Sequence, residues 1–325
     1  MKTYATLGPA CCDEATLTAM LRLGVTGFRL NLSHCTLPEC RPWTDALQRA
    51  GAAAGVRPEL IIDMRGPEMR LGILPHPIKV QNGDAFTFGA DGVALDADIL
   101  AALKPGQEIL VDDGAVVFVV ETGDTHSVHC RCTQGGTIES HKSLTLPGVQ
   151  LCRNAVSPAD VADLAVAAEY GVTAIMQPFV RSRRDLLELR QALETQGLSH
   201  LRIFAKVEDA QGIETLKEWM DLCDVVTIAR GDLGSNLPLW ELPRAQKRIA
   251  ATCRAAHHDF LVVTHLLQSM IHHPVPTRAE VTDIYNACLD GATSLMLTGE
   301  TAQGAYPLAA VEMLLRVANC GEQDR

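Results

Sequence analysis

Short apolar segments recur along the chain, and polar or charged residues follow most of them directly. Within each segment the residues are continuously apolar, which is typical of strands buried on both faces, as in a parallel sheet. We predict eight such strands, at Tyr4–Leu7, Gly27–Leu30, Leu60–Ile62, Ala174–Met176, Ile203–Ala205, Val225–Ile228, Leu261–Val263 and Leu295–Leu297.

Helical patterns lie between most of these strands. Ser157 is a predicted N-cap, with Pro158 at the first helical position and Asp160 in the first turn. Further helices are predicted at Glu14–Leu23, Asp185–Thr195, Ile213–Met220, Pro243–Ala256, Arg278–Leu289 and Leu308–Val317. This alternation predicts an α/β fold, a (β/α)8 TIM barrel, whose active site lies at the carboxyl ends of the strands.

One interval, residues 71–152, breaks the alternation. It contains strand-like pieces separated by Gly-Asp, Asp-Gly and Gly-Gly turn signals, at Ala85–Phe88, Ile109–Val111, Val116–Val120 and Val128–Cys132. We therefore predict a small β-barrel domain inserted after the third strand, with 1–70 and 153–325 forming the TIM barrel. An insertion at that rim can act as a lid that excludes water, and a passive insertion is the alternative.

Composition and charge restrict the possible partners. A net charge of −11 disfavours binding to nucleic acid or to an anionic membrane, because both would be repelled over most of the surface. The eleven cysteines are odd in number and lack CxxC spacing, so we expect free, mostly buried thiols. Such thiols are typical of a protein in the reducing environment of the cytoplasm. No apolar run approaches the ~20 residues of a membrane span, and no signal segment is recognised at the amino terminus.

Cationic and oxygen-bearing side chains follow the second and third strands. Arg29, Asn31 and Ser33 share one side of an extended segment, and together offer a cation beside two oxygen ligands. Asp63 then precedes Arg65 and Arg70, whose guanidinium groups suit bidentate contacts with phosphate. A solvated network of ion pairs is the alternative for these arginines.

The fifth and sixth strands lead into carboxylates. Glu208 and Asp232, at the ends of neighbouring strands, could share one hard cation such as Mg²⁺ and leave positions open for substrate oxygens. Lys206 points to the same side as Glu208 and would place a fixed positive charge beside the metal, as phosphoryl transfer requires. The alternative for Lys206 is a buried ion pair with one of these acids, which could coexist with catalysis.

Hydroxyl groups follow the last two strands. Thr264 and Thr298 could relay a proton through water to a substrate, although a threonine in a strand is often only structural. His265 is better explained as a surface residue than as a wall of the site. No G-x-x-x-x-G-K-[ST] or G-x-G-x-x-G motif is present, so a nucleotide would have to bind at the barrel rim.

These motifs resemble the pyruvate kinase family over almost the full chain. The matching stretches are Thr6–Ala10, Arg29–His34, Asp63–Arg70, Val111–Gly114, Leu146–Gly148, Lys206–Glu208, Ala229–Gly234, Pro276–Glu280 and Leu297–Ala302. The resemblance implies a barrel domain, a mobile β lid, and phosphoryl transfer from phosphoenolpyruvate to ADP with Mg²⁺ (or Mn²⁺) and often K⁺. It also implies a cytoplasmic glycolytic enzyme, with a second copy of the chain as a candidate partner in a homo-oligomer.

The resemblance assigns roles residue by residue. Lys206 resembles the lysine that stabilises the transferring phosphoryl group, and Arg29 resembles the residue between phosphate and nucleotide. Arg70 is expected to contact phosphate on the chemistry of its guanidinium group given above. Glu208 and Asp232 resemble the divalent-metal ligands. The expected K⁺ ligands are Asn31, Ser33, Asp63 and the backbone oxygen of Met64, with Glu68 matching an acid linked to K⁺ dependence. His34 and Gly231 are expected beside the nucleotide or substrate, Thr264 beside the enolate, and Thr298 in the proton relay.

Several residues depart from the family pattern near the expected ligands: Met64 and Arg65 replace Thr-Lys, Pro178 a serine, His265 a glutamine, Thr145 an asparagine and Cys35 a glycine. The sequence stops after the eighth helix, so we expect the family's carboxyl-terminal effector domain to be absent. Two alternatives remain open: a Mg²⁺-dependent lyase acting on a pyruvate-like enolate, and a binding or regulatory protein that has lost turnover. Nucleotide dependence separates the first from a kinase, and cation-dependent turnover excludes the second.

Overall fold

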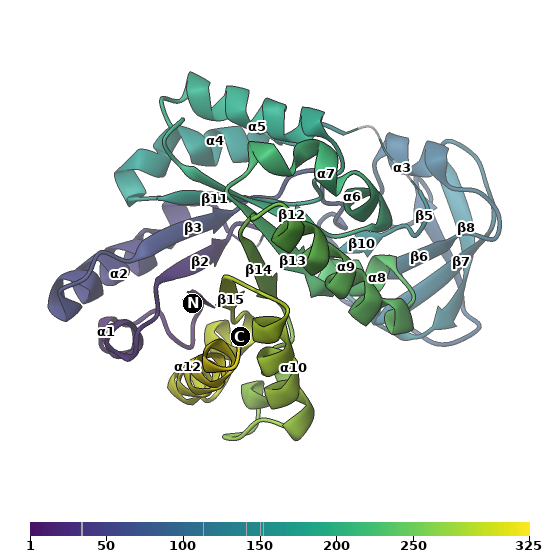
Figure 1. The fold of residues 1–325 in the computed structure, drawn as a ribbon. Coiled ribbons are helices and arrows are strands. Elements are labelled where there is room, and N and C mark those ends of the chain that lie inside the picture. Colours follow the sequence, from purple (N-terminus) through teal and green to yellow (C-terminus); the bar gives the residue numbers. More distant parts are fainter. Residues whose placement is uncertain (34, 113, 141, 150, 152) are drawn as a thin grey trace. The chain divides into compact units, whose positions relative to one another are not determined.

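Eight parallel strands close into a barrel in the computed structural model, which describes residues 1–33, 35–112, 114–140, 142–149, 151 and 153–325 (Figure 1). The strands are β1 (Lys2–Thr6), β2 (Gly27–Asn31), β3 (Glu59–Asp63), β11 (Ala174–Gln177), β12 (Arg202–Val207), β13 (Val225–Ala229), β14 (Phe260–Val263) and β15 (Ser294–Met296). Around the barrel they pair in the order β1-β15-β14-β13-β12-β11-β3-β2, and β2 returns to β1. All eight predicted strands are confirmed to within two residues at their ends.

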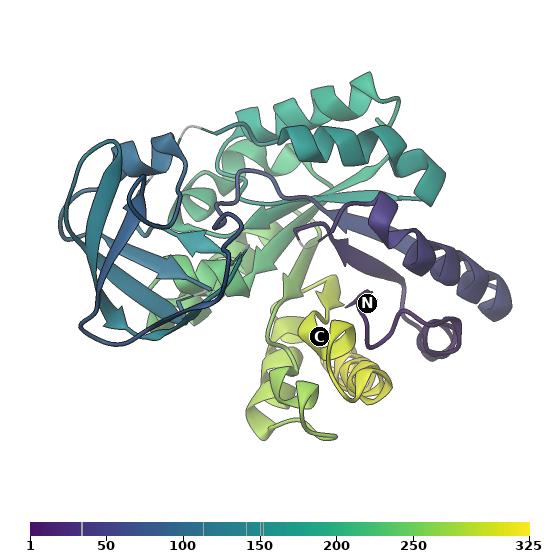
Figure 2. The same ribbon diagram turned by 180° about the vertical axis from the view of Figure 1, so that it is seen from behind.

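Helices surround the barrel on its outside, as both ribbon views show (Figures 1 and 2). The α-helices of this part are α1 (Glu14–Leu23), α2 (Arg41–Ala54), α4 (Pro158–Val166), α5 (Arg183–Thr195), α6 (Ala210–Glu214), α7 (Leu216–Trp219), α8 (Arg230–Asn236), α9 (Leu242–Ala255), α10 (Arg278–Leu289), α11 (Gly299–Ala302) and α12 (Pro307–Gln323). Short 3₁₀ turns occur at Pro38–Cys40, Ala167–Tyr170, Met220–Leu222, Leu239–Glu241 and Gln268–Ile271. The fold is therefore the predicted (β/α)8 barrel.

The helix ends follow the sequence signals closely. Asp13 caps α1 by accepting a hydrogen bond from the backbone N–H of Thr16. Ser157 and Asp160 form a reciprocal capping box at the start of α4, as the sequence predicts. Thr277 and Glu280 form another at the start of α10, which gives the Pro276–Glu280 motif a structural explanation.

The helix α2 and the segment Ile213–Met220 differ from the prediction. Helix α2 was not predicted, although Thr44, Leu47, Ala50 and Gly51 place a buried face along it at helical spacing. The predicted helix Ile213–Met220 is divided into α6 and α7 at Thr215. The Thr215 hydroxyl donates to the carbonyl of Arg181 and accepts from the indole N–H of Trp219, so side-chain hydrogen bonds accompany this break.

The barrel interior is filled by apolar side chains that point inward from the strands, namely Tyr4, Ile61, Ala174, Met176, Phe204, Val225, Ala229, Leu261, Val263 and Met296. At the amino-terminal ends of the strands, Glu59 accepts a hydrogen bond from the Tyr4 hydroxyl and pairs with Lys2 and Arg202. This packed interior is not a pore, so chemistry must occur at an end of the barrel, and in barrels of this kind it occurs at the carboxyl end.

The insertion is rich in β-structure. Its elements are β4 (Ile78–Val80), β5 (Ala85–Gly89), α3 (Ala97–Ala102), β6 (Glu108–Val111), β7 (Val116–Gly123), β8 (Ser127–Gln134), β9 (Gly136–Ile138) and β10 (Leu144–Thr145). In the described residues they form a five-stranded sheet, β10-β6-β7-β8-β5, and a separate β4-β9 pair, rather than the predicted closed small barrel. The reason is that β4 and β9 are three residues long and pair only with each other.

The insertion has its own hydrophobic core. Phe86, Phe88 and Phe118 stack against one another with ring centroids 4.7–5.3 Å apart, and Ile109 and Val128 are buried with them. By internal contacts the chain divides into one unit of Met1–Gly66, Asn154–Leu233 and Trp240–Arg325, and a second of Pro67–Arg153 and Gly234–Leu239. The predicted boundaries at 70/71 and 152/153 differ from this division by four residues and one residue.

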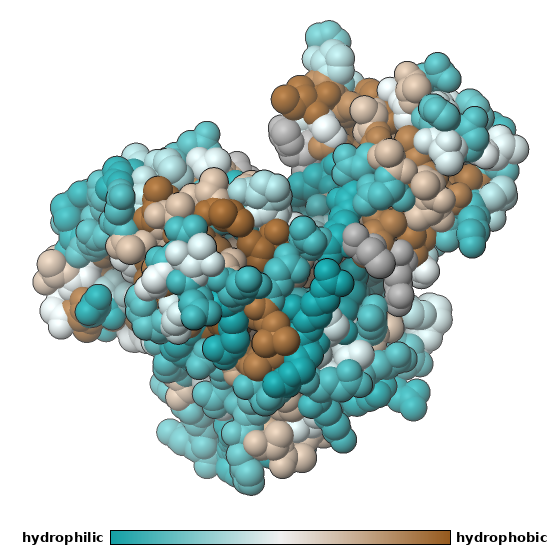
Figure 3. All heavy atoms as spheres, turned by 90° about the horizontal axis from the view of Figure 1, so that it is seen from above, coloured by the Kyte–Doolittle hydropathy of each residue, from teal (hydrophilic) through white to brown (hydrophobic). Residues whose placement is uncertain are grey.

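The molecular face drawn in Figure 3 is largely hydrophilic, with hydrophobic side chains gathered in separate patches. In the part of the chain that the structure describes, no helix is both long enough and apolar enough to cross a bilayer.

Candidate active site

The predicted site residues of the barrel unit gather at the carboxyl ends of its strands. Because all eight strands are parallel, these ends meet at one rim. The residues come from the end of β2, the end of β3, the end of β12 and the segments that follow β13, β14 and β15, and they are Arg29, Asn31, Asp63, Lys206, Glu208, Asp232, Thr264 and Thr298.

Asp63 anchors a buried ion network at this rim. Its side chain is 2% exposed, and its Oδ2 accepts from Nε and Nη2 of Arg29 at 2.8 and 2.6 Å. The ammonium of Lys206 lies 3.4 Å from the same oxygen, and Nη1 of Arg29 is 3.4 Å from the Thr6 hydroxyl. The carboxylate therefore fixes two cationic side chains, which become a preorganised positive region.

Lys206 also pairs with Glu208, with Nζ 2.8 Å from Oε1. Burial alone would lower the pKa of Lys206, but the carboxylates of Asp63, Glu208 and Asp232 outweigh it and raise that pKa above its usual range. Burial raises the pKa of Glu208 above its usual range, against the opposing effect of Lys206. The pairing with an acid that was the alternative for Lys206 is thus present, and the three carboxylates together favour the charged form of the lysine.

Glu208 also holds the loop that follows β11. Its Oε2 accepts from the backbone N–H of Phe179 at 2.8 Å, and Phe179 has a positive φ of 50°. A bulky residue seldom adopts this conformation, so the hydrogen bond helps to maintain it. Sequence reasoning did not find this contact, because it joins two segments that are distant along the chain.

The loop after β14 has an unusual backbone as well. Thr264 and His265 have positive φ angles of 77° and 56°, and a β-branched residue such as Thr264 rarely adopts such an angle. The carbonyl of Thr264 accepts from Nε and Nη2 of Arg230 at 3.1 and 2.8 Å, and Arg230 is anchored by Asp283 at 2.6 Å. This clamp fixes Thr264 at the rim, while the His265 side chain is exposed, as expected.

Gly231 lies against Thr264. A Cβ atom built at Gly231 would be 3.2 Å from Cγ2 and 3.8 Å from Oγ1 of Thr264, so a larger residue would push on the threonine. Asp232 is in the first turn of α8, directly after Gly231. The sequence predicted that the Arg230–Gly234 motif follows the end of a strand. In the structure β13 ends at Ala229, and the motif forms the start of helix α8.

Thr298 is joined to a buried carboxylate that had no assigned role. Its hydroxyl is 3.2 Å from Oε2 of Glu300, which also accepts from the Thr298 backbone N–H. Glu300 is fully buried, and its Oε1 accepts from the backbone N–H of Leu267. Glu300 therefore positions Thr298, and the only sequence signal for it was its place in the Leu297–Ala302 motif.

The residues expected to hold K⁺ lie together at the ends of β2 and β3. Asn31 pairs in register with Asp63, and its Oδ1 accepts from the backbone N–H of Ser33 at 3.2 Å. Met64 is buried and follows Asp63 directly. Pro178 is buried. It lies close to Gly66, two residues after Met64, because a Cβ atom added at Gly66 would be 2.6 Å from Cγ of Pro178.

The carboxylate pair can be tested against Mg²⁺. The described residues contain no group of three or more His, Cys, Asp and Glu side chains arranged to hold a metal ion. Mg²⁺ is usually bound by one or two carboxylates, with water and substrate phosphate completing its shell. Glu208 and Asp232 fit this donor set, because both are carboxylic acids at the same rim and lie close enough to Lys206 for each to raise its pKa.

Two other predicted arginines pair with acids of their own. Arg65 donates to Asp163 at 2.7 Å and to the carbonyl of Cys35 at 2.6 Å, and its phosphate contact stays a prediction. Arg70 belongs to the second unit and pairs with Glu68 at 2.8 Å. His34 lies outside the described residues.

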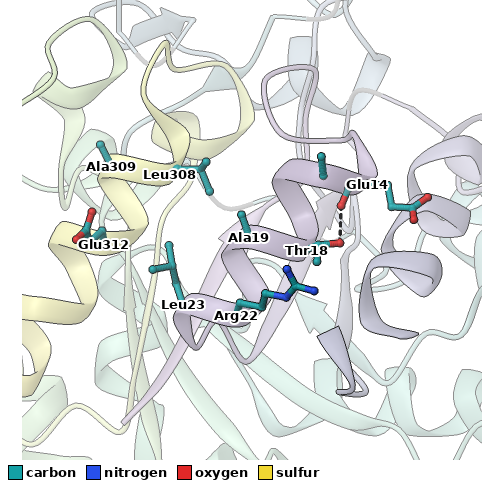
Figure 4. Close-up of a pocket in the computed structure, with 9 residues that line it drawn as sticks. Glu14, Thr18, Ala19, Arg22, Leu23, Leu308, Ala309 and Glu312 are labelled. Atoms are coloured by element: carbon teal, nitrogen blue, oxygen red, sulfur yellow. Dashed lines mark hydrogen bonds between the residues drawn. The ribbon is translucent and has the colours of Figure 1, made fainter. Parts of the chain in front are cut away.

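A cavity of about 870 Å³ lies elsewhere, between α1 and α12 on the outside of the barrel (Figure 4). Its walls include Ala19 and Leu23 from one helix and Leu308 and Ala309 from the other, with Arg22 at its edge. None of the predicted site residues line it, so it is not the site of the proposed chemistry.

Comparison with known proteins shows the family to which this barrel belongs. The family model described as "Pyruvate kinase, barrel domain" matches residues 1–311. The chain belongs to the pyruvate kinase family. It is 32% identical to a pyruvate kinase of Clostridium perfringens, with 99% of this chain and 70% of that protein covered. The pyruvate kinase of Aeropyrum pernix is 35% identical, with 98% and 70% covered, and that of Chlamydia pneumoniae 34%, with 97% and 67% covered.

The pyruvate kinase match includes both units and every predicted site residue, since the last of these is Thr298. The resemblance inferred from the sequence motifs is therefore confirmed at the level of the family. The roles of single residues stay predictions.

Proposed function

We propose that this protein transfers the phosphoryl group of phosphoenolpyruvate to ADP and gives pyruvate and ATP. The observation that supports it best is the Lys206 ammonium, held 2.8 Å from Glu208 and 3.4 Å from Asp63 at the strand-end rim of a pyruvate kinase family barrel. A charge fixed in this way stabilises negative charge that moves during phosphoryl transfer.

In the proposed reaction the phosphorus–oxygen bond to the enol oxygen breaks, and a new bond forms to the terminal oxygen of ADP. Lys206 and Arg29 contact the transferring phosphoryl group. Asp63 orients both of them through the contacts described above, and it limits their movement when substrate binds.

We assign Glu208 and Asp232 to Mg²⁺ (or Mn²⁺), which when bound would neutralise phosphate charge and orient the phosphate oxygens. The loop hydrogen bond from Phe179 keeps the Glu208 carboxylate in place. Asn31, Ser33, Asp63 and the Met64 carbonyl are the proposed K⁺ ligands, and the family's general requirement for a divalent metal and K⁺ supports both assignments.

The enolate left by phosphoryl transfer must take up a proton at carbon to become pyruvate. We propose that Thr264 lies beside this enolate and that Thr298 passes the proton through water. Arg230 holds the backbone carbonyl of Thr264, and the Thr298 hydroxyl donates a hydrogen bond to Glu300, so both residues are fixed at the rim.

Further residues and the inserted domain are proposed to take part in substrate binding. Gly231, Asp232 and His34 contact the nucleotide or substrate, and Arg70 contacts phosphate. The inserted domain, which the chain enters after β3 and leaves before α4, acts as a lid. The protein works in the cytoplasm.

The test is pyruvate formation from phosphoenolpyruvate in matched reactions that omit ADP, Mg²⁺ or K⁺ in turn. We expect turnover only with ADP and the divalent metal, and faster turnover with K⁺. Pyruvate formed equally well without a nucleotide would instead favour the lyase. No turnover under any condition would favour a binding protein.

A further inference from the structure

Two cysteines near the carboxyl end of β2 lie in direct contact. The thiol of Cys40 donates to Sγ of Cys35 across 2.8 Å, which is about 0.8 Å longer than a disulfide bond of about 2.05 Å. Among the described cysteines, Cys35 and Cys40 are the two whose sulfur atoms lie within hydrogen-bonding distance of each other. The proposed catalytic rim uses neither thiol.

The segment between these cysteines is held by its own hydrogen bonds. The backbone N–H and hydroxyl of Thr36 both donate to Oε2 of Glu39, at 2.7 and 2.9 Å. The N–H of Cys40 donates to the carbonyl of Leu37, whose own N–H donates to Asp163. The two sulfur atoms are therefore brought together by a fixed loop, and little backbone movement is needed to join them.

Access differs between the two thiols. Cys35 is partly exposed, whereas Cys40 is 3% exposed. A small oxidant can therefore reach Cys35 first, and Cys40 lies behind it in position to react with the product.

We propose that Cys35 and Cys40 form a reversible redox site that closes to an intramolecular disulfide when the protein meets a peroxide. The Cys35 sulfur attacks one peroxide oxygen, the oxygen–oxygen bond breaks, and the other oxygen takes the Cys35 thiol proton and leaves as water, so that Cys35 becomes a sulfenic acid. The Cys40 sulfur then attacks the Cys35 sulfur, and the hydroxyl leaves with the Cys40 proton as a second water. Two thiols lose two electrons in total, and one peroxide gains them.

The disulfide would act on the neighbouring segment of the rim. The Cys35 thiol is 3.5 Å from the backbone carbonyl of Asn31, and disulfide formation removes the proton that this thiol donates. Because Asn31 is a proposed K⁺ ligand, oxidation is expected to raise the K⁺ concentration needed for half-maximal activity several-fold. This second consequence rests on the proposed function, whereas the disulfide itself does not.

The test treats the reduced full-length chain with hydrogen peroxide and digests it, without reductant, with a protease that cleaves after glutamate. Cleavage after Glu39 separates the two cysteines, so their peptides stay joined only if the disulfide has formed. We expect this joined product, with the intact mass lower by two hydrogen atoms, and its loss on adding dithiothreitol. Cys320→Ser, which removes an exposed thiol, should behave like the parent, and Cys40→Ser should give no joined product.

The redox site would be overturned by overoxidised Cys35 without a joined product, or by a disulfide between another pair of cysteines. The parent protein alone decides this, even if a variant fails to fold. The K⁺ titration is read separately, on oxidised and reduced protein. Unchanged K⁺ dependence with the disulfide present would overturn only the effect on the rim. If neither form turns over phosphoenolpyruvate, the proposed function and this effect fail together, and the mass measurement still decides the redox site.

Discussion

Lys206 and Glu208 are two residues apart at the end of β12, and the lysine Nζ is 2.8 Å from the glutamate Oε1. Both side chains are almost completely buried, at 13% and 0% exposure. Burying two charged groups has a desolvation cost, and their mutual attraction often does not offset it. Such a pair is therefore weak evidence for a purely stabilising role. We therefore interpret the pair as a catalytic arrangement.

Replacing Lys206 by methionine should reduce pyruvate formation about 10²-fold or more, because a preorganised positive charge is lost. Asp63 keeps Arg29 as a partner, so the fold should persist, with a lower melting temperature. Lys247→Met is a matched control, since Lys247 is exposed and pairs with Asp290 away from the rim. Equal turnover by the parent and the Lys206 variant would contradict the assignment.

Glu208→Gln and Asp232→Asn should each raise the Mg²⁺ concentration required for activity, because each removes a charged oxygen ligand from a site with few protein ligands. The measurement is a Mg²⁺ titration of the rate at saturating substrate. Asp221→Asn, at an exposed surface pair with Arg183, should leave the titration unchanged. If both rim variants titrate like the parent, the divalent metal binds elsewhere.

We expect K⁺ to activate the protein and Pro178→Ser to lower the K⁺ concentration needed. Proline at 178 has neither a hydroxyl nor a backbone N–H to orient neighbouring oxygens, and serine restores both. Pro158→Ser, at the exposed first position of α4, is the control. Equal rates in K⁺ and tetramethylammonium would exclude the K⁺ site. Unchanged K⁺ affinity in Pro178→Ser would exclude only this explanation.

Thr227→Val should stabilise the protein by about 1 kcal/mol, because it removes a buried hydroxyl that has no hydrogen-bond partner in the described structure while preserving shape. Thr293→Val provides the contrast, since the Thr293 hydroxyl bonds both the N–H and the carbonyl of Phe260 and should be costly to lose. Denaturant unfolding of both variants gives the comparison. A loss of stability in Thr227→Val would reveal a partner for its hydroxyl.

The barrel could be predicted because its strands are continuous apolar runs, and because residues such as Lys206 and Glu208 follow them at a register fixed by strand geometry. Pairings across the chain could not be predicted in this way. Nothing in the sequence distinguishes Arg29, which binds Asp63, from Arg65, which binds Asp163, because folding decides which carboxylate each guanidinium meets.

Tertiary contacts also explain the residues that sequence reasoning missed. Glu300 supports Thr298 and the Leu267 backbone from within a helix of four residues, for which no periodic pattern exists. The contact between Cys35 and Cys40 depends on the 3₁₀ turn at Pro38–Cys40, which no helical or strand periodicity reveals. In both cases short irregular segments position the side chains.

The central claim is tested most directly by ³¹P nuclear magnetic resonance of a reaction containing the parent protein, phosphoenolpyruvate, ADP, Mg²⁺ and K⁺. We predict that the phosphoenolpyruvate signal is replaced by the γ-phosphate signal of ATP, with one ATP formed for each pyruvate, and that Lys206→Met slows this exchange about 10²-fold or more. Release of inorganic phosphate without ATP, or no change in the spectrum of the folded parent protein, would contradict the account.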